Sequence, residues 1–320
     1  MNILISSAGR RTSLVNAFVE ACGDSRRVIV ADADPLAPAL LVADDGVVVP
    51  RLDQPGFVDE MLLICERYDV GMIVPTIDTE LPLYAHYRDR FESKGVMTLV
   101  SSLELIETTS SKKRTEEVFT PAGIRTPRSW GGSLGHLNDL PSELFVKPDR
   151  GSASAHTYQS SPEHLEAILA LVPDPIVQER IDAIELTVDA LLDLRGVPVH
   201  LVPRIRLKTV GGESVQGVTM PDDTIREWLL RVFDVVAGLG GWGPMTVQLF
   251  LTAPEPTLVE VNPRFGGGFP LAYEAGAQYP QWILRMLDGQ KLEPRLGQYR
   301  RGLFMTRSLV ERFIDGAWDQ

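Results

Sequence analysis

The first hundred residues contain short, uninterrupted apolar runs separated by spacers that are long enough to hold helices. The runs are Ile3–Ile5, Val28–Ala31, Val47–Val49, Met72–Val74 and Met97–Val100. A strand that is apolar at every position needs cover on both faces, which is typical of a parallel sheet flanked by helices. We therefore predict an α/β fold that begins with a parallel-sheet domain, in which ligands bind at the carboxyl ends of the strands.

Polar loops follow three of these strands at the edge where ligands are expected. They are Ser6–Arg11, Asp32–Asp34 and Thr76–Glu80. Asp32 and Asp34 also have the character of turn residues, because aspartate side chains hydrogen-bond to the backbone two residues further on. The residue pattern therefore assigns no role to the loops around Arg10, Asp32 and Asp78.

The residue pattern changes near residue 110, where a charged helix is predicted over Ser110–Thr120. Short strands of a smaller sheet follow at Phe145–Val146, Thr157–Gln159 and Ile176–Gln178. Longer strands come next, at Leu186–Leu192, Val199–Arg206, Met245–Leu251, Thr257–Asn262 and Leu303–Val310, with helices over residues 225–236 and Tyr279–Leu287. These changes divide the chain into three predicted units, residues 1–110, 111–182 and 183–320.

The composition excludes several classes of protein. Hydrophobic residues make up 44% and charged residues 23%, as in ordinary globular proteins, and no apolar run approaches the length of about 18 residues that spans a membrane. The net charge of −12 repels phosphate backbones, so we expect no nucleic-acid partner. Cys22 and Cys65 have no metal-binding spacing, and we interpret them as reduced core thiols of a cytoplasmic protein.

The strongest chemical signal is the segment Thr257–Arg264. Side chains alternate along a strand, so the carboxylate of Glu260 and the amide of Asn262 lie on one face. Gln248 stands between apolar neighbours on the preceding strand and is expected to face both across a hairpin. Oxygen ligands of this kind suit Mg²⁺, although a polar-faced edge hairpin explains the same pattern.

A second signal is a lysine next to a loop of small residues. Lys147 follows the apolar pair Phe145–Val146 and precedes Pro148, which favours an extended backbone at a strand end. The loop from Gly151 to Ala155 includes Ser152, and small residues let backbone N–H groups approach anionic oxygens closely. This arrangement predicts a lid over phosphates, and an ordinary hairpin turn is the alternative.

Two weaker signals concern the following segments. Residues 176–181 lead into a connection between two sheets, whose backbone could face an adenine edge, and Glu185 could accept from ribose hydroxyls. On its own, a solvated acidic connection explains these residues better. Arg204, Arg206 and Lys208 alternate along one strand, which indicates either an anionic substrate or a solvated basic face.

One motif matches a nucleotide-binding fingerprint by letter only. The glycines of residues 238–243 have the spacing G-x-G-x-x-G, which binds dinucleotides where a strand ends and a helix begins. Here the glycines follow a predicted helix and precede a predicted strand. We therefore interpret them as a helix end and a tight connection, and we do not expect an NAD-dependent oxidoreductase.

The order of these segments resembles the ATP-grasp superfamily, and in particular one synthetase half of the large chain of carbamoyl-phosphate synthase. The matching segments are Ser111–Lys113, Gly123–Pro127, Phe145–Pro148, Arg150–Ser152, Gln178–Glu179, Glu185–Asp189, Val247–Gln248 and Val259–Gly268. The resemblance covers nearly the whole chain. It implies a Rossmann-like domain that precedes a two-lobed α+β ATP-grasp domain.

The resemblance also implies a role for individual residues. For the nucleotide, it implies phosphate contacts from Lys113, Lys147, Gly151 and Ser152, adenine contacts from Glu179, Arg180 and Ile181, and a ribose contact from Glu185. For the metal and the acyl substrate, it implies Mg²⁺ or Mn²⁺ ligands at Gln248, Glu260 and Asn262, catalytic roles for Asn262, Arg206 and Arg264, and substrate contacts from Arg204, Arg206, Arg264 and Gly267. Gln248 stands where many ATP-grasp enzymes have an acid.

The implied reaction transfers the γ-phosphoryl group of ATP to a carboxylate, which an amine or similar nucleophile then attacks. Because the chain is much shorter than the resembled large chain, we expect a ligase for a small carboxylic or amino acid rather than a source of carbamoyl phosphate. A carboxyphosphate-forming enzyme and a nucleotide-binding regulator without turnover are the alternatives. The expected partners are ATP, a small carboxylate and an amine, and a homodimer is compatible with the sequence.

Overall fold

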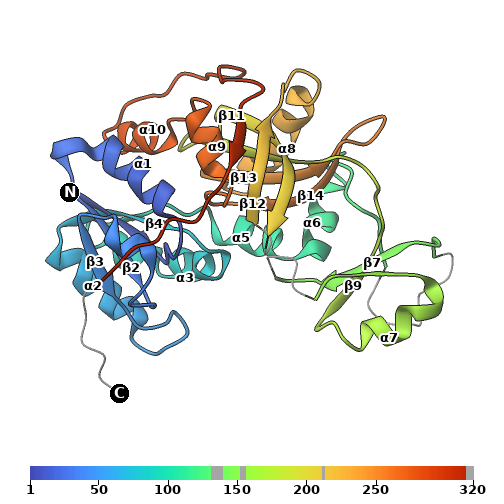
Figure 1. The fold of residues 1–320 in the computed structure, drawn as a ribbon, viewed down its shortest axis with the longest axis horizontal. Helices are drawn as coiled ribbons and strands as arrows, with labels where there is room; N and C mark the ends of the chain where they lie inside the picture. The colour runs from blue at the N-terminus through green and yellow to red at the C-terminus, as the bar shows by residue number, and fades with distance from the viewer. Residues whose placement is uncertain (131–139, 152–155, 211–212, 315–320) are drawn as a thin grey trace.

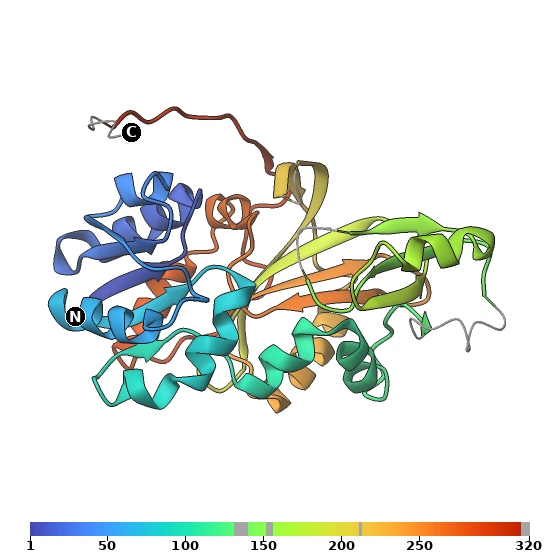
Figure 2. The ribbon, with the colours of Figure 1, turned by 90° about the horizontal axis from the view of Figure 1, so that it is seen from below.

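The computed structural model describes residues 1–130, 140–151, 156–210 and 213–314. Its described strands form three sheets, one in each predicted unit (Figure 1). The parallel-sheet unit lies at one end of the molecule, the large antiparallel sheet lies in the middle, and the small sheet lies at the other end (Figure 2). Within the described residues, no helix is both long and apolar enough to cross a bilayer.

The first sheet confirms the predicted parallel arrangement. Its strands lie in the order β3-β2-β1-β4-β5 and span Asn2–Ser6 (β1), Val28–Asp32 (β2), Asp45–Val48 (β3), Val70–Pro75 (β4) and Met97–Thr98 (β5). Its helices are α1 (Thr12–Cys22), α2 (Phe57–Arg67), α3 (Leu81–His86) and α4 (Arg88–Glu92), with short 3₁₀ turns at Gly23–Ser25, Pro38–Leu41 and Asp78–Glu80.

The two faces of this sheet are covered by different parts of the chain. Ile3 and Ile5 pack in one core with α1 and with Trp282 of helix α10 (Tyr279–Leu287). Leu4 points to the opposite face and packs in a second core with residues of α2 and α3. The first unit therefore shares its core with a helix from the last part of the chain.

The charged helix predicted over Ser110–Thr120 corresponds to one helix over Lys112–Phe119, and a separate helix precedes it. Helix α5 (Leu103–Ser110) ends at Ser111, whose extended backbone separates it from α6 (Lys112–Phe119). The Ser111 hydroxyl accepts a hydrogen bond of 3.2 Å from the Arg114 amide, which is the geometry of a helix N-cap. This cap fixes which side chains of α6 point toward the rest of the protein.

The small sheet has the order β6-β9-β7-β8, and its neighbouring strands are antiparallel. Its strands are β6 (Ser129–Trp130), β7 (Leu144–Pro148), β8 (Tyr158–Ser160) and β9 (Pro175–Glu179). Helix α7 (Leu165–Leu169) follows the 3₁₀ turn Pro162–His164. Ser161 precedes this turn but makes no side-chain cap contact, and its hydroxyl lies 3.1 Å from Nδ1 of His164.

The large sheet is antiparallel and has the order β14-β13-β10-β11-β12-β15. Its strands are β10 (Glu185–Leu192), β11 (Pro198–Val210), β12 (Glu213–Thr219), β13 (Gly243–Phe250), β14 (Thr257–Asn262) and β15 (Phe304–Thr306). Helix α8 (Arg226–Gly238) packs on one face, and α9 (Phe269–Glu274) and α10 pack toward the other. The strand predicted over Leu303–Val310 is shorter than expected, because the residues after Thr306 extend into solvent with Leu309 and Phe313 exposed.

The glycines of residues 238–243 lie between the end of α8 and the start of β13. A helix therefore precedes them and a strand follows, which confirms the predicted order of elements. This order is the reverse of the one that binds a dinucleotide.

Candidate functional site

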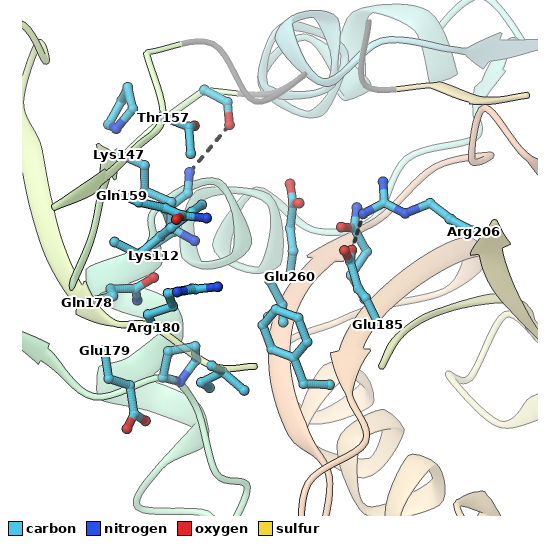
Figure 3. Close-up of a pocket in the computed structure, with 18 residues that line it drawn as sticks. Lys112, Lys147, Thr157, Gln159, Gln178, Glu179, Arg180, Glu185, Arg206 and Glu260 are labelled. Atoms are coloured by element: carbon cyan, nitrogen blue, oxygen red, sulfur yellow. Dashed lines mark hydrogen bonds and ion pairs between the residues drawn. The ribbon is translucent and has the colours of Figure 1, made fainter. Parts of the chain in front are cut away.

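A cavity of about 360 Å³ lies between the small sheet and the large sheet (Figure 3). Strands β7, β8 and β9 contribute residues on one side, and β10, β11, β13 and β14 contribute residues on the other. The charged and amide side chains that line it are Lys112, Lys147, Gln159, Gln178, Glu179, Arg180, Glu185, Arg206, Gln248 and Glu260. Most residues of the two strongest sequence signals thus lie around one space.

The predicted hairpin places two oxygen-bearing side chains side by side. Gln248 on β13 is the register partner of Glu260 on β14, and both line the cavity. Asn262 lies two residues further along β14, opposite Thr246, and is only 6% exposed and outside the cavity lining. Among the described residues, no group of three His, Cys, Asp or Glu side chains is suited to a metal ion. The fit to Mg²⁺ therefore rests on one carboxylate and two amide oxygens, which are ligands that hard cations accept.

Lys147 is the cation that enters the cavity from the end of β7. Its ammonium lies 5.7 Å from the centre of the Phe145 ring. Burial and, after it, the neighbouring Lys112 lower the pKa of Lys147 to about 8. Because burial removes part of the water around this ammonium, a phosphate that pairs with it and accepts its hydrogen bonds would be bound strongly.

Lys112 lines the cavity, whereas Lys113, the residue that we predicted, does not. The Lys112 ammonium donates to the backbone oxygens of Asp149 (3.1 Å) and Gly151 (3.4 Å). Lys113 forms an exposed ion pair of 3.3 Å with Asp174. The choice follows from the N-cap at Ser111, since a shift of one residue turns a helical side chain by about 100°. Recognising that cap in the sequence would have favoured Lys112.

Buried Asp149 joins the start of α6 to the loop that follows β7. Its carboxylate accepts from the Ser111 hydroxyl (2.7 Å) and from the Lys113 amide (2.9 Å). Gly151 follows with φ 132°, a conformation that L side chains rarely adopt, and it lines the cavity. Ser152 and residues 153–155 lie outside the described residues.

The connection between the two sheets lies along the same cavity. Glu179, Arg180 and Ile181 all line it, but the side chains of Glu179 and Arg180 have other partners nearby. The Glu179 carboxylate accepts from the Arg128 amide (3.1 Å) and points away from Glu260 in Figure 3, while Arg180 pairs with Glu143 at 2.8 Å. The amides of Glu179 and Arg180 donate to the backbone oxygens of Arg128 (3.0 Å) and Glu143 (3.4 Å), so the Ile181 amide is the donor of this segment for which the described residues show no partner.

The basic strand β11 does not present the three cations on one face that we expected. Arg206 lines the cavity and forms an ion pair with Glu185 on the neighbouring strand, as Figure 3 shows. Arg204 is 2% exposed, lies outside the cavity lining, and donates from Nε to Asp189 at 2.7 Å. The register is irregular between Arg206 and Lys208, and Lys208 is exposed. Arg204 is therefore a buried structural cation here rather than a surface for substrate.

Arg264 lies outside the cavity lining and contacts the first unit. Its guanidinium donates to both carboxylate oxygens of Asp78, from Nε at 2.8 Å and from Nη2 at 2.7 Å. Gly267, another predicted substrate contact, accepts a hydrogen bond from Arg307 through its backbone oxygen. The loop that contains Asp78 therefore meets the end of the predicted metal hairpin.

Asp32, in the second polar loop of the first unit, acts as a turn residue. Its carboxylate accepts from the amides of Gly9 (2.7 Å) and Asp34 (2.9 Å). These bonds fix the loop after β1 against the end of β2, which matches the alternative given for Asp32 in the sequence.

Comparisons with known proteins agree with this arrangement. Two family models match the chain, "PylC-like, N-terminal domain" over residues 3–99 and "ATP-grasp in the biosynthetic pathway with Ter operon" over residues 172–306. The chain is 24% identical over 275 residues to phosphoribosylamine–glycine ligase of Mycobacterium leprae, covering 75% of this chain and 65% of that protein. It therefore spans just under two thirds of the length of this relative.

Two more distant similarities extend the comparison. The large chain of carbamoyl phosphate synthase from Pseudothermotoga lettingae is 22% identical over 265 residues, which is 77% of this chain and 24% of that one. The crystal structure of L-amino acid ligase from Bacillus licheniformis superimposes with a TM-score of 0.69 at 20% identity and covers 89% of this chain and 73% of that one. The latter likeness establishes the shared fold.

Proposed function

Because this chain belongs to the ATP-grasp superfamily of ATP-dependent ligases, we propose that it joins a small carboxylic or amino acid to an amine or similar nucleophile while ATP is converted to ADP and phosphate. The observation that carries this proposal is the pairing of Gln248 with Glu260 across a cavity from Lys112 and Lys147. Oxygen ligands on one wall and ammonium groups on the other are complementary to a metal-bound triphosphate.

The two lysines and the connecting segment would bind the nucleotide. Lys147 and Lys112 place positive charge where a triphosphate enters, and burial makes each charge more effective than it would be in water. The backbone of residues 179–181 would contact the adenine edge, and Glu185 would face the ribose. Because Glu185 is paired with Arg206, we expect a ribose hydroxyl to share this carboxylate with the guanidinium.

Gln248, Glu260 and Asn262 would hold Mg²⁺ at the end of the same hairpin. When bound, the metal neutralises phosphate charge and orients the γ-phosphoryl group. Glu260 brings the carboxylate, and the two amides add oxygens without adding negative charge. Such a site holds a metal that arrives together with a nucleotide more firmly than a free metal ion, because the phosphates supply the remaining ligands.

A carboxylate is a poor electrophile, so transfer of the γ-phosphoryl group would provide the leaving group that an attacking amine needs. The bond between the γ-phosphorus and the bridging oxygen of ATP breaks as a carboxylate oxygen attacks, and phosphate leaves when the amine replaces it. Arg206 and Arg264 would stabilise the charge on the transferred group. The protein otherwise positions the reactants and excludes water.

The similar proteins support a small amino or carboxylic acid as the substrate class. The names of two of them include glycine and an L-amino acid. We also propose that residues 1–110, 111–182 and 183–320 act as the three units of this ligase, since α5 ends at Ser110 and the two antiparallel sheets separate after β9.

The test is a screen for ADP release from Mg-ATP with amino acids and small carboxylic acids offered in pairs, followed by mass measurement of the product. Glu260→Gln should lower turnover about 100-fold or more, because it removes the carboxylate of the metal site. Glu255→Gln is the matched control, since Glu255 lies in the turn of the same hairpin and pairs only at the surface with Arg231.

Unchanged turnover in Glu260→Gln would show that the metal assignment is wrong. Tight binding of Mg-ATP without ADP release across the whole panel would instead support a nucleotide-binding regulator. A product that forms only with bicarbonate would point to the carboxyphosphate-forming alternative.

A further inference from the structure

We propose that Asp78 is a positioning residue that holds the guanidinium of Arg264 in its reactive orientation across the boundary between the first unit and the large sheet. This inference rests on the proposed function, because it assigns a role to Asp78 in the same reaction. Asp78 lies in the 3₁₀ turn Asp78–Glu80 after β4, and Arg264 follows β14.

The contact has the geometry of a two-point fork. Arg264 donates from Nε to Oδ1 at 2.8 Å and from Nη2 to Oδ2 at 2.7 Å. Its side chain is 13% exposed and that of Asp78 is 32% exposed, so the pair is partly withdrawn from water. A bidentate pair fixes the plane of the guanidinium as well as its position, which a single contact does not do.

The fork does not use up the donors of Arg264. A guanidinium carries five N–H bonds. Asp78 accepts two of them, and the backbone oxygen of Phe265 accepts a third from Nη1 at 3.1 Å. One N–H on Nη1 and one on Nη2 are left for the oxygens of a bound phosphoryl or carboxylate group. Asp78 therefore orients the cation and leaves one edge of it available.

Asp78 is itself held in place by the buried carboxylate of Glu80. Glu80 is 0% exposed and accepts from the amides of Thr76 (2.6 Å) and Ile77 (3.2 Å). It also accepts from the hydroxyls of Ser6 (2.7 Å) and Ser7 (3.0 Å) at the end of β1. The two hydroxyls thus join the turn to the central strand of the sheet, the two amides close the turn on itself, and together they leave Asp78 little freedom to follow a moving partner.

The segment that contains Arg264 is restrained from the other side as well. The Phe265 oxygen accepts from Arg11 at 2.9 Å, so the first unit forms hydrogen bonds with this segment at a second residue besides Arg264. A Cβ atom on Gly266 would lie 2.9 Å from Oδ1 of Asp189, and one on Gly268 would lie 2.3 Å from Cζ of Arg204. The backbone of residues 264–268 is therefore pressed against a buried ion pair, and the side chain of Arg264 is fixed at both its base and its tip.

Two roles for Asp78 can be separated by kinetics. If Asp78 positions Arg264, Asp78→Asn should lower kcat by about 10- to 100-fold with little change in the KM for Mg-ATP, since small misplacements of a catalytic group have effects of that size. If Asp78 instead competes with an anionic substrate for Arg264, the same change should lower the KM for the acid and leave kcat intact. That result would overturn the proposal.

The turnover experiment uses the acid and amine that give most ADP release in the screen, with Mg-ATP and the acid varied in turn. Asp78→Glu keeps the charge and should recover part of the activity, and Asp59→Asn is the control because Asp59 forms a comparable but exposed pair with Arg90 at 2.6 Å. In an Arg264→Ala background, Asp78→Asn should have no further effect on kcat. Independent, additive losses would contradict the proposal.

A second measurement needs no substrate. Amide hydrogen exchange of peptides covering residues 262–268 should become faster in Asp78→Asn and stay unchanged in Asp59→Asn. If exchange in this segment does not change, the positioning role is wrong, even where ligase turnover is confirmed. If exchange changes but the wild-type protein shows no turnover with any pair, the structural link stands and the proposed ligase function fails.

Discussion

The two lysines of the nucleotide cavity, Lys112 and Lys147, differ from the two arginines around the loop after β14 in how they are paired. Among the described residues, Lys147 has no carboxylate within ion-pairing distance, and Lys112 donates only to backbone oxygens. Arg204 and Arg264 each donate to a carboxylate, Asp189 and Asp78 respectively. The lysines can gain a strong partner when an anion binds, whereas each of these arginines already has a carboxylate partner that holds its guanidinium in one orientation.

This difference indicates a division of labour within the proposed site. Desolvated, unpaired ammonium groups favour binding, because a bound phosphate relieves their lost hydration. Paired guanidinium groups contribute little to affinity but keep a fixed geometry, which is the property that lowers an activation barrier. Changes on the lysine side should therefore act mainly on nucleotide affinity, and changes on the arginine side should act mainly on stability and kcat.

The largest expected effect comes from removing the cation at the cavity. Lys147→Met should weaken Mg-ATP binding by roughly 10- to 100-fold, because a hydrogen bond to a charged group is worth about 1.5–3 kcal/mol. Isothermal titration calorimetry measures this change directly. Lys94→Met removes an exposed lysine far from the cavity and should leave the affinity as it is. An unchanged Kd in Lys147→Met would show that the cavity lysines do not determine nucleotide affinity.

The fixed geometry of the paired arginines is tested by adding a methyl group next to the guanidinium of Arg204. A methyl group in Gly268→Ala would lie 2.3 Å from Cζ of Arg204, and the guanidinium cannot withdraw without leaving Asp189. We expect the free energy of unfolding to fall by about 1–3 kcal/mol, as measured by urea unfolding. Gly238→Ala is the control, since nothing lies within 4 Å of the added atom at the end of α8. Equal stability of the two variants would show that the backbone of residues 264–268 moves to accommodate the methyl group at little cost.

The smallest expected effect is a pH dependence of nucleotide affinity. The pKa of Lys147 is lowered to about 8 in the free protein, chiefly by burial, and a bound triphosphate would raise it by favouring the protonated form. Binding then takes up a proton above pH 8, so affinity is highest below that pH and falls by up to about tenfold per pH unit above it. Titrations between pH 7 and 9 should show this decline. Lys147→Met should show a much flatter profile, and a steep profile in that variant would assign the effect to another group.

The fold could be predicted from the sequence where local pattern and burial coincide. The continuous apolar strands required a covered parallel sheet, and helix α10 spans the same residues, Tyr279–Leu287, that the periodicity indicated. The pairing of Gln248 with Glu260 also followed from alternation along two strands joined by a short turn. In each case neighbours in sequence determine the outcome.

The remaining features depend on contacts between distant segments. Alternation places Arg204 and Arg206 on the same side of a strand, but it cannot indicate that Gly268 packs against the guanidinium of Arg204. The fork between Asp78 and Arg264 joins residues 186 positions apart. Both residues were visible as polar groups at strand ends, and only the three-dimensional arrangement makes them partners.

The sharing of one core between α1 and α10 has a consequence for how the chain is made. On the ribosome the parallel sheet emerges first, but the apolar side of α1 is completed only by Trp282 and its neighbours. At ordinary translation rates that helix follows on the order of 10 s later. During that interval the nascent chain exposes the apolar side of α1. We expect chaperones that bind such surfaces to raise the yield of folded protein.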